Sequence, residues 1–367
     1  MSFLSHLLKT SRLCARADHS ALLAILDFSY QHYALGDVLT TQVKLATMTI
    51  EEGLTQIDMV VMVNPRLPST RYQPFITSAN YITHLNNIMA IFTCNPMLRS
   101  LQIVRDPLTF NLIALARHLA RARMWPAFDT HLSMRQDYPV AHDTLNAFYA
   151  RRGYLPELRA PHRLEAWARD FHRTELNGRP LAIINPRQSS LTDSPAVTYR
   201  DAPLDDWYAF LDAAGAREPE FLFVMVGGFQ EWEHRLLYRR NVFVPRASGL
   251  TLAHELALMK IADLFMGTSS GFATFATFTA LPYAILNVQK EFAPYAGIKP
   301  DDRHYPFARP NQILTWHRET AEELAALFEE IDTNKDGKID PKEFKAYLKK
   351  KAEQKAGFEE ATPLVAP

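Results

Sequence analysis

The chain has 367 residues, of which 47% are hydrophobic, and this length suffices for two domains and a smaller appendage. Lys and Arg together number 40, as do Asp and Glu, so the formal net charge is zero and gives no case for nucleic-acid binding. The chain has two cysteines, Cys14 and Cys94. They make no disulfide framework, which favours a reducing, cytoplasmic location over secretion.

Residues 1–16 carry three basic side chains and one histidine but no acidic residue, and apolar residues recur among them at helical spacing. Two interpretations are open. A basic amphipathic helix would lie on a membrane surface, or act as a transit peptide in a eukaryote, and would make the protein membrane-associated. A first helix packed on the body of the protein explains the same pattern.

The N-terminal half alternates short apolar runs with helical patterns. Buried strands are predicted at 21–28, 57–64 and 101–105, where the apolar runs are nearly uninterrupted. Helices are predicted at 38–56, 72–93, 109–123 and 142–152. Because strands that alternate with helices form parallel sheets, residues 18–152 are predicted to be a first Rossmann-like domain.

Residues 153–161 contain two prolines and no periodicity, and they mark a boundary between domains. The alternation then restarts, with strands predicted at 181–185, 220–226 and 241–245 and helices at 164–176, 204–214 and 252–261. Residues 162–318 are therefore predicted to form a second Rossmann-like domain. Two such α/β units leave a cleft between the carboxyl ends of their sheets, and ligands of these folds bind there.

The second domain contains a strand, a glycine-flanked turn and a helix within residues 262–287. A short apolar run at 262–266 precedes the turn, and Pro282 ends the helix before another strand at 283–287. The turn consists of Gly267, Thr268, Ser269, Ser270 and Gly271. Its glycines let the backbone approach a ligand closely, and the N-terminus of the following helix is a ready anion site.

Three other interpretations of this stretch are open. An ordinary strand-turn-helix corner would explain the hydroxyl residues by capping alone. An uncharged membrane span over 264–288 would be interrupted by two glycines and Pro282. Residues 267–271 also spell G-x-S-x-G, the nucleophile elbow of serine hydrolases with Ser269 as the nucleophile, but no later strand pattern places the acid and histidine that this fold requires.

A polar loop follows the first predicted strand. Its sequence, SYQHYALGD, ends in Gly36 and Asp37, directly before the helix predicted at 38–56. From its position alone, Asp37 can serve as the N-cap of that helix. His32 lies in the same loop.

A second polar segment, INPRQSSLTD, follows the strand at 181–185. It contains Arg187, Ser189 and Ser190. An Arg at the end of a strand suits a bidentate phosphate contact, and the alternative is a surface Arg paired with Asp193.

With these motifs, the chain resembles bacterial glycosyltransferases of the GT-B architecture, and among them the heptosyltransferase-like group, over about residues 20–318. The resemblance implies that the first domain binds the acceptor and the second binds a nucleotide-sugar donor. It also implies that Asp37 is the general base, with His32 as the second candidate, and that the donor diphosphate contacts Arg187, Ser189, Ser190 and residues 267–271. Relatives usually carry an Asp, and often a His, around the last turn, where this chain has Ser269 and Thr274.

The most specific motif lies near the C-terminus. Residues 332–343 read DTNKDGKIDPKE and fit an EF-hand calcium loop at every ligand position. The predicted Ca²⁺ ligands are Asp332, Asn334, Asp336, the Lys338 carbonyl, Asp340 and Glu343. Apolar residues at helical spacing flank the loop, so the EF-hand is predicted to span 319–352, with its entering helix as the last helix of the GT-B body. Calcium could therefore set how the two halves close.

The sequence thus predicts a two-domain GT-B-like glycosyltransferase with a C-terminal EF-hand and a disordered tail at 353–367. It would move a sugar from a nucleotide-sugar donor to a hydroxyl of a glycan or a lipid-linked acceptor, with no metal in the transfer itself. Two alternatives are a calcium-binding protein on a catalytically inactive transferase-like body and a serine hydrolase with Ser269 as nucleophile. No nucleic-acid partner is expected, and membrane contact would come through residues 1–16.

Overall fold

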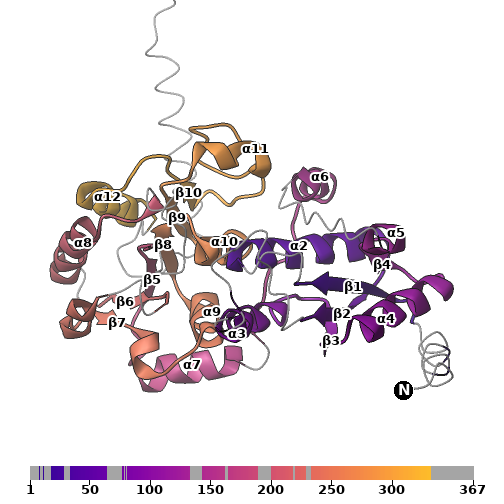
Figure 1. The fold of residues 1–367 in the computed structure, drawn as a ribbon. Helices are drawn as coiled ribbons and strands as arrows, with labels where there is room; N and C mark the ends of the chain where they lie inside the picture. The colour runs from indigo at the N-terminus through magenta and orange to yellow at the C-terminus, as the bar shows by residue number, and fades with distance from the viewer. Residues whose placement is uncertain are drawn as a thin grey trace, which may run out of the picture.

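A computed structural model describes residues 18–28, 34–63, 81–132, 143–161, 164–188, 200–217, 220–228 and 233–331, together with positions 8, 11, 77 and 79. These residues form two α/β lobes, each with its own sheet (Figure 1). Several predicted features lie outside the described residues: His32, Ser189, Ser190, the calcium loop at 332–343, the tail at 353–367 and all but two positions of 1–16.

The N-terminal lobe contains a four-stranded parallel sheet with the strand order β3-β2-β1-β4. Its strands are β1 (Ala21–Asp27), β2 (Gln56–Met62), β3 (Leu98–Val104) and β4 (Met124–Trp125). Its helices are α2 (Leu35–Glu51), α3 (Tyr81–Phe92), α4 (Pro107–Leu119), α5 (Phe128–Leu132) and α6 (Asp143–Arg152). Strand β1 is buried on both faces: Leu22 packs in the cluster that contains Leu39 of α2, and Leu23 in the cluster that contains Phe110 of α4.

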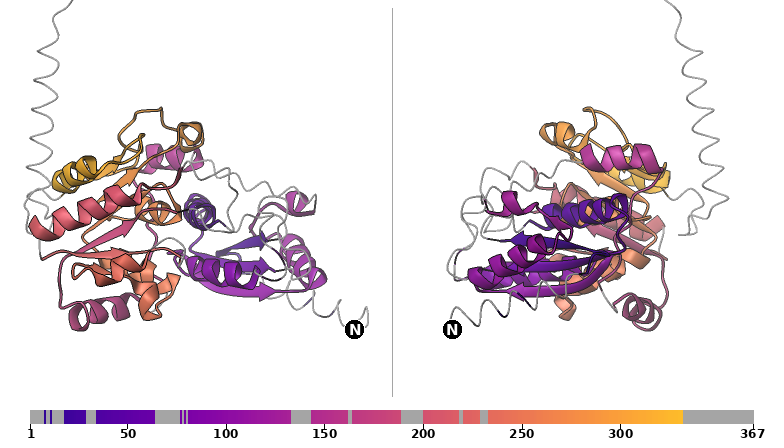
Figure 2. Two further views of the ribbon diagram at one scale, coloured as in Figure 1. Left: turned by 60° about the vertical axis from the view of Figure 1, so that its left-hand side comes forward. Right: turned by 90° about the vertical axis from the view of Figure 1, so that its right-hand side faces the viewer.

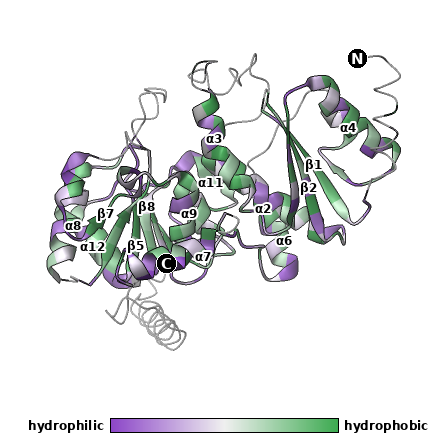
Figure 3. Ribbon diagram, turned by 90° about the horizontal axis from the view of Figure 1, so that it is seen from below, coloured by the Kyte–Doolittle hydropathy of each residue, from purple (hydrophilic) through white to green (hydrophobic). Residues whose placement is uncertain are grey.

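The C-terminal lobe contains a six-stranded parallel sheet with the order β10-β9-β8-β5-β6-β7. Its strands are β5 (Leu181–Asn185), β6 (Leu222–Met225), β7 (Val242–Phe243), β8 (Leu264–Thr268), β9 (Tyr283–Leu286) and β10 (Gln312–Leu314). Its helices are α7 (Leu164–Thr174), α8 (Leu204–Arg217), α9 (Leu252–Ile261), α10 (Gly271–Thr277), α11 (Ala293–Ala296) and α12 (Ala321–Ile331). Figure 3 shows that the strands of this sheet are hydrophobic along most of their length, as strands covered by helices on both faces must be.

The predicted fold class, two Rossmann-like parallel sheets, is confirmed. The helix predicted at 38–56 differs from α2 at both ends, and the difference at its start concerns Asp37. Helix α2 begins at Leu35 with Ala34 as its N-cap residue, so Asp37 lies in the first helical turn and is not the N-cap. The same helix ends at Glu51, well before residue 56, because the chain turns at Gly53 with a positive φ of 70°.

Each sheet has a switch point, where the strand order reverses. In the C-terminal sheet, β6 and β7 extend the sheet from one side of β5, while β8, β9 and β10 extend it from the other. In the N-terminal sheet, β2 and β3 lie on one side of β1 and β4 on the other. Because open α/β sheets bind ligands outside the carboxyl ends of the strands at such a point, the fold favours ligand binding beyond the ends of β5 and β8.

The two lobes meet where α2 packs against α10 and α3 against α9. In the left view of Figure 2, the indigo helix α2 lies between the lobes. The connecting segment is tied to both sides, because the Leu158 N–H donates to the Phe278 carbonyl at 2.9 Å and the Arg159 N–H to the Cys94 carbonyl at 2.9 Å. The lobes are therefore joined by packing as well as by the linker.

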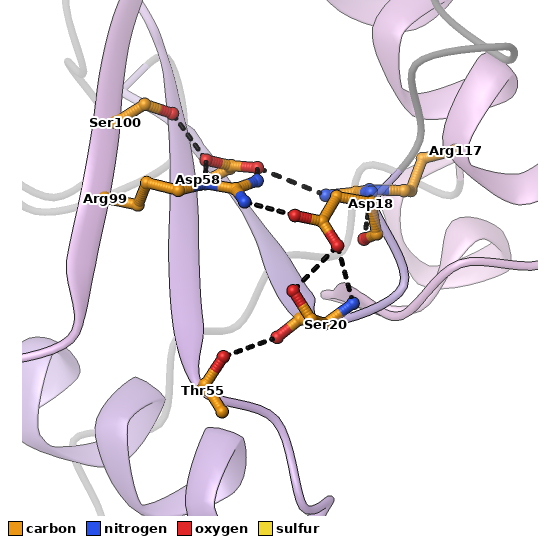
Figure 4. A network of polar contacts seen from close by, with 7 residues as sticks. All are labelled: Asp18, Ser20, Thr55, Asp58, Arg99, Ser100 and Arg117. Atoms are coloured by element: carbon orange, nitrogen blue, oxygen red, sulfur yellow. Dashed lines mark hydrogen bonds and ion pairs between the residues drawn. The ribbon is translucent and has the colours of Figure 1, made fainter.

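A polar network fastens the amino-terminal end of the first sheet (Figure 4). The Arg99 guanidinium on β3 pairs with the carboxylates of Asp18 and Asp58. Arg117 of α4 reaches Asp58 at 3.6 Å and donates to the Asp18 carbonyl at 2.9 Å. The hydrogen bond from Arg99, joined by those from Ser20, holds the pKa of Asp18 well below its usual range.

Among the described residues, no helix combines the length and apolar character that crossing a membrane requires.

Candidate functional site

The turn after β8 is built around the N-terminus of α10. Ser270 is the N-cap residue of that helix, and its hydroxyl accepts the Ala273 N–H at 3.3 Å. The same hydroxyl donates to Asn185 Oδ1 at 2.6 Å, and Asn185 Nδ2 donates to the Val226 carbonyl at 2.8 Å. Asn185, which is almost fully buried, thereby fixes the ends of β5, β6 and β8 relative to one another.

Glycine is needed at position 267 because of its close neighbours. Gly267 pairs with Asn185 across the β5 and β8 strands. A Cβ atom there would lie 2.8 Å from the Phe265 ring and 2.9 Å from the Asn185 carbonyl oxygen, closer than side chains approach. The structure therefore accounts for Gly267 by close packing on the neighbouring strand, and the close approach to a ligand stays a prediction.

The two predicted motifs from different domains lie against each other. A Cβ atom at Gly271 would lie 2.5 Å from the Leu35 Cβ, and one at Gly36 would lie 2.9 Å from the Thr274 hydroxyl oxygen. The first turns of α2 and α10 are thus in direct contact because both carry glycine. Asp37, the residue after Gly36, is half-buried in the first turn of α2, where the helix dipole favours a carboxylate.

Thr268 is the last residue of β8 and is fully buried. Its hydroxyl donates to Glu319 Oε1 at 2.7 Å and accepts the Arg187 N–H at 3.3 Å. The side chain thus holds the end of β8 to the loop after β5, whereas the sequence predicted Thr268 to lie in the turn. Any contact of Thr268 with a ligand would have to come from its backbone.

Arg187 lies directly after β5, as predicted, and its side chain is 13% exposed. It pairs with Asp201 at 2.9 Å, whereas Asp193, the partner considered as the alternative, lies outside the described residues. The Arg187 carbonyl also accepts the Ala202 N–H at 2.9 Å. Arg187 is therefore held near the end of β5 by a partly buried ion pair.

Arg200 is a residue of this site that the sequence analysis missed. Its guanidinium donates to the Ser269 carbonyl at 2.8 Å and lies 5.3 Å from the Phe292 ring centroid. The Ser269 N–H donates to the Leu286 carbonyl at 2.8 Å. Arg200 sits in a segment without hydrophobic periodicity, so only its charge, close after a run of polar residues, could have drawn attention to it.

Among the described residues, no histidine is hydrogen-bonded to Ser269. His304 Nδ1 is bonded to the Gln312 carbonyl at 2.8 Å, and His317 pairs with Glu323 at 2.6 Å. The backbone of Ser269 is engaged with Leu286 and Arg200. The described part of the chain thus shows a strand-to-helix corner at the G-x-S-x-G pattern and no base hydrogen-bonded to Ser269 that would activate it.

Glu255 of α9 is a charged helix residue, yet it is not solvated. It is fully buried, accepts the Gly227 N–H at 3.1 Å and pairs with Arg246 at 2.7 Å. Burial raises the pKa of Glu255 to about 7, against the opposing effects of Arg246 and the Gly227 N–H. Both carboxylate oxygens have partners, so Glu255 fixes the end of β6 and is not positioned to take a ribose hydroxyl.

One cavity of about 680 Å³ lies away from this site. It is bordered by the linker at 153–157, the C-terminal end of α10 and residues 307–312. The strand ends at the switch point do not line it, so its size is no guide to the candidate site. Among the described residues, no cluster of three or more His, Cys, Asp or Glu side chains could hold a metal ion.

Comparison with known proteins gives matches of fold and of one motif. The chain is similar in structure to the glycosyl transferase family 9 protein from Veillonella parvula, with 12% identity, a TM-score of 0.46, and coverage of 91% of this chain and 97% of that one. It is similar to E. coli heptosyltransferase WaaC with ADP, with 12% identity, a TM-score of 0.46, and coverage of 85% and 99%. For E. coli ADP-heptose lps heptosyltransferase II, the identity is 10%, the TM-score 0.43, and the coverage 75% and 87%.

These structural neighbours are of the group that the sequence resembles. The EF hand family model matches residues 324–349, which include the predicted calcium loop. No curated protein matches the sequence. The EF-hand prediction is thus confirmed by the family match, which begins within α12.

Proposed function

We propose that the protein is a glycosyltransferase that moves a sugar from a nucleotide-sugar donor to an acceptor hydroxyl where α2 meets α10. The observation that carries the proposal is the contact of Gly36 and Gly271, which brings Asp37 next to the turn at the switch point of the second sheet. A carboxylate on one lobe and a helix N-terminus with arginines on the other are the parts that such a transfer needs.

The donor diphosphate would bind outside the ends of β5 and β8. The N–H groups of Gly271 and Phe272 have no hydrogen-bond acceptor among the described residues, whereas that of Ala273 is taken by Ser270. Arg187 and Arg200 add positive charge next to the turn, and Ser189 and Ser190, which follow Arg187 in the sequence, are the further predicted contacts. These groups would stabilise the negative charge that grows on the diphosphate as the bond from the sugar breaks.

Asp37 would take the proton from the acceptor hydroxyl as that oxygen forms its bond to the sugar. His32 is the second candidate for this role. The acceptor, a glycan or a lipid-linked glycan, would approach from the N-terminal lobe.

The EF-hand would bind Ca²⁺ through the oxygens of residues 332–343. Its donor set consists of carboxylates, one amide and one backbone carbonyl, which is the oxygen-only set that calcium prefers. Calcium is not placed in the transfer step.

Substitution of Asp37 tests the proposal. Asp37→Asn should lower sugar transfer by at least about 100-fold, because general base catalysis contributes about 10²–10⁴-fold, while the affinity for a nucleoside diphosphate stays within about two-fold. The matched control is Asp143→Asn, which changes an exposed first-turn carboxylate on α6. Transfer is followed as nucleoside diphosphate release from ADP-, UDP- and GDP-sugars with glycan acceptors. Binding without any transfer by the wild type would leave the inactive-body alternative, and no nucleotide binding would reject the proposal.

A further inference from the structure

Glu319 is a buried carboxylate just before the last described helix, α12. Its side chain is 1% exposed. One oxygen, Oε1, accepts the Thr268 hydroxyl at 2.7 Å and the Trp207 indole N–H at 3.3 Å. The other oxygen, Oε2, is buried without a hydrogen-bond partner among the residues that the structure describes. Burying a carboxylate costs free energy unless hydrogen bonds compensate it. The two hydrogen bonds to Oε1 are therefore important for holding Glu319 in this position.

These hydrogen bonds lead from α12 to both segments of the candidate site. Thr268 ends β8 and directly precedes Ser269 in the turn. Its hydroxyl also accepts the Arg187 N–H at 3.3 Å, which holds the start of the loop after β5. A shift of Glu319 would therefore move the turn and the loop together.

Helix α12 belongs to the domain core and to the EF-hand at the same time. The family match begins at residue 324, within the helix, and the first predicted calcium ligand, Asp332, directly follows Ile331, the last residue of α12. The Phe328 ring lies 5.1 Å from that of Phe221, and Leu324 and Leu327 are buried in the same cluster. The face that an entering helix normally turns to its EF-hand partner is here packed in the transferase-like body.

Both ends of α12 are also fixed by polar contacts. At its start, the Ala321 N–H donates to Asp206 at 3.2 Å. In its last turn, Glu330 pairs with Arg303 at 3.0 Å. An α-helix of 11 residues is about 16 Å long, and packing along that length makes it a rigid connection between its ends.

We propose that Glu319 is a positioning residue through which calcium binding at 332–343 stabilises the turn at 267–271. Coordination by Asp332 fixes the last turn of α12, the packed helix fixes Glu319, and Glu319 holds Thr268. Calcium then binds more tightly to the protein in which α12 is docked, and by linkage it stabilises that docking and the turn. The part of this inference that concerns nucleotide affinity rests on the proposed function of the turn.

Hydrogen exchange of the full-length protein tests the coupling without any nucleotide. We expect the amides of residues 269–273 to exchange at least about five-fold more slowly in saturating calcium than in chelator, the lower end of usual coupling strengths. Thr268→Val removes the hydroxyl that Glu319 holds, so it should bind calcium and lose the difference. The exchange rate in chelator is divided by the rate in calcium for each variant separately. A change in the basal exchange rate of a variant therefore cancels.

Three control variants separate this role from general loss of packing. Thr277→Val makes the same substitution in another buried threonine, whose hydroxyl donates to the Ala273 carbonyl and not to Glu319, and it should keep the calcium effect. Glu319→Gln keeps an acceptor oxygen for Thr268 and Trp207, so this variant should also keep the calcium effect. Glu343→Gln, which removes the calcium ligand at the last loop position, should abolish it.

Nucleotide binding gives the second measurement. Saturating calcium should raise the affinity for ADP at least about five-fold in calorimetry, and saturating ADP should raise the calcium affinity by the same factor, because linkage is reciprocal. UDP and GDP serve as further probes.

The outcomes are distinguishable. A wild type that binds no calcium, or binds it without slowing exchange at the turn, overturns the inference, and this result needs no variant. Thr268→Val that keeps the calcium effect also overturns it. If calcium slows exchange but ADP, UDP and GDP do not bind, the proposed function fails and the coupling stands.

Discussion

Replacing Gly271 by alanine tests the contact between the two lobes. The added Cβ would lie 2.5 Å from the Leu35 Cβ and within 2.7 Å of two further Leu35 carbons, whereas ordinary contacts begin at 3.4 Å. The helices must therefore separate by about 0.9 Å at this point. Overpacking of this kind costs about 1–3 kcal/mol. In an isolated helix the same change would stabilise by up to about 1 kcal/mol, so a loss of stability identifies the contact as its cause.

The separation also moves Asp37 relative to the turn. Since a misplacement of about 1 Å can lower an enzymatic rate about 100-fold, Gly271→Ala should reduce sugar transfer more strongly than it reduces ADP affinity. Urea denaturation gives the free energy of unfolding, and nucleotide release gives the rate. Leu35→Gly removes the opposing Cβ, so the double variant should regain part of both. A Gly271→Ala protein with wild-type stability and transfer would refute the reasoning.

Three further predictions concern stability. Burial raises the pKa of Glu255 from 4.5 to about 7, so its contribution to the free energy of unfolding is present below about pH 4.5 and is lost as the pH rises through about 7. In urea denaturation between pH 4.5 and 7.5, Glu255→Gln should make the free energy of unfolding depend less on pH. An unchanged pH dependence would contradict the assignment. The hydrogen bond from Arg99 keeps the pKa of Asp18 below its ordinary 3.8, so the stabilisation that Asp18 contributes is present above pH 3.8 and is lost on acidification. Asp18→Asn should therefore make the free energy of unfolding, measured by urea denaturation, less dependent on pH below 4. Phe328→Ala should cost about 3–5 kcal/mol in urea denaturation and weaken calcium binding in calorimetry, whereas loss of stability with unchanged calcium affinity would separate α12 from the loop.

Helix α9 has the predicted bounds, and β5 does too. The two-residue strand β7 was predicted over 241–245, because it lies in the apolar run at 242–244. Strands β4 and β10 were missed, since they have two and three residues and no strand pattern was recognised around them. They lie at sheet edges, where pairing with a long neighbour determines them, so local sequence does not reveal them.

The sequence predicted those parts of the candidate site that lie directly after predicted strands. The segments after β5 and β8 were found because parallel strands bring their carboxyl ends to one edge. Glu319 was not, because its partner Thr268 is 51 residues away in sequence and no local pattern links a buried hydroxyl to a buried carboxylate. The burial of Glu255 was not predictable either, because the partly buried Arg246 that pairs with it precedes α9 in a separate segment.

The two glycine motifs are explained better together than separately. A capped corner accounts for the residues of 267–271, and a first-turn carboxylate that favours the helix dipole accounts for Asp37. Neither explanation requires Gly36 and Gly271 to lie in contact across two domains. The same contact places the first turns of two helices, one from each lobe, at a switch point. A strand-to-helix corner with a purely structural role does not need a helix of the other lobe against it. A transfer between substrates bound to the two lobes does need both helix N-termini close to the bond that is made and broken.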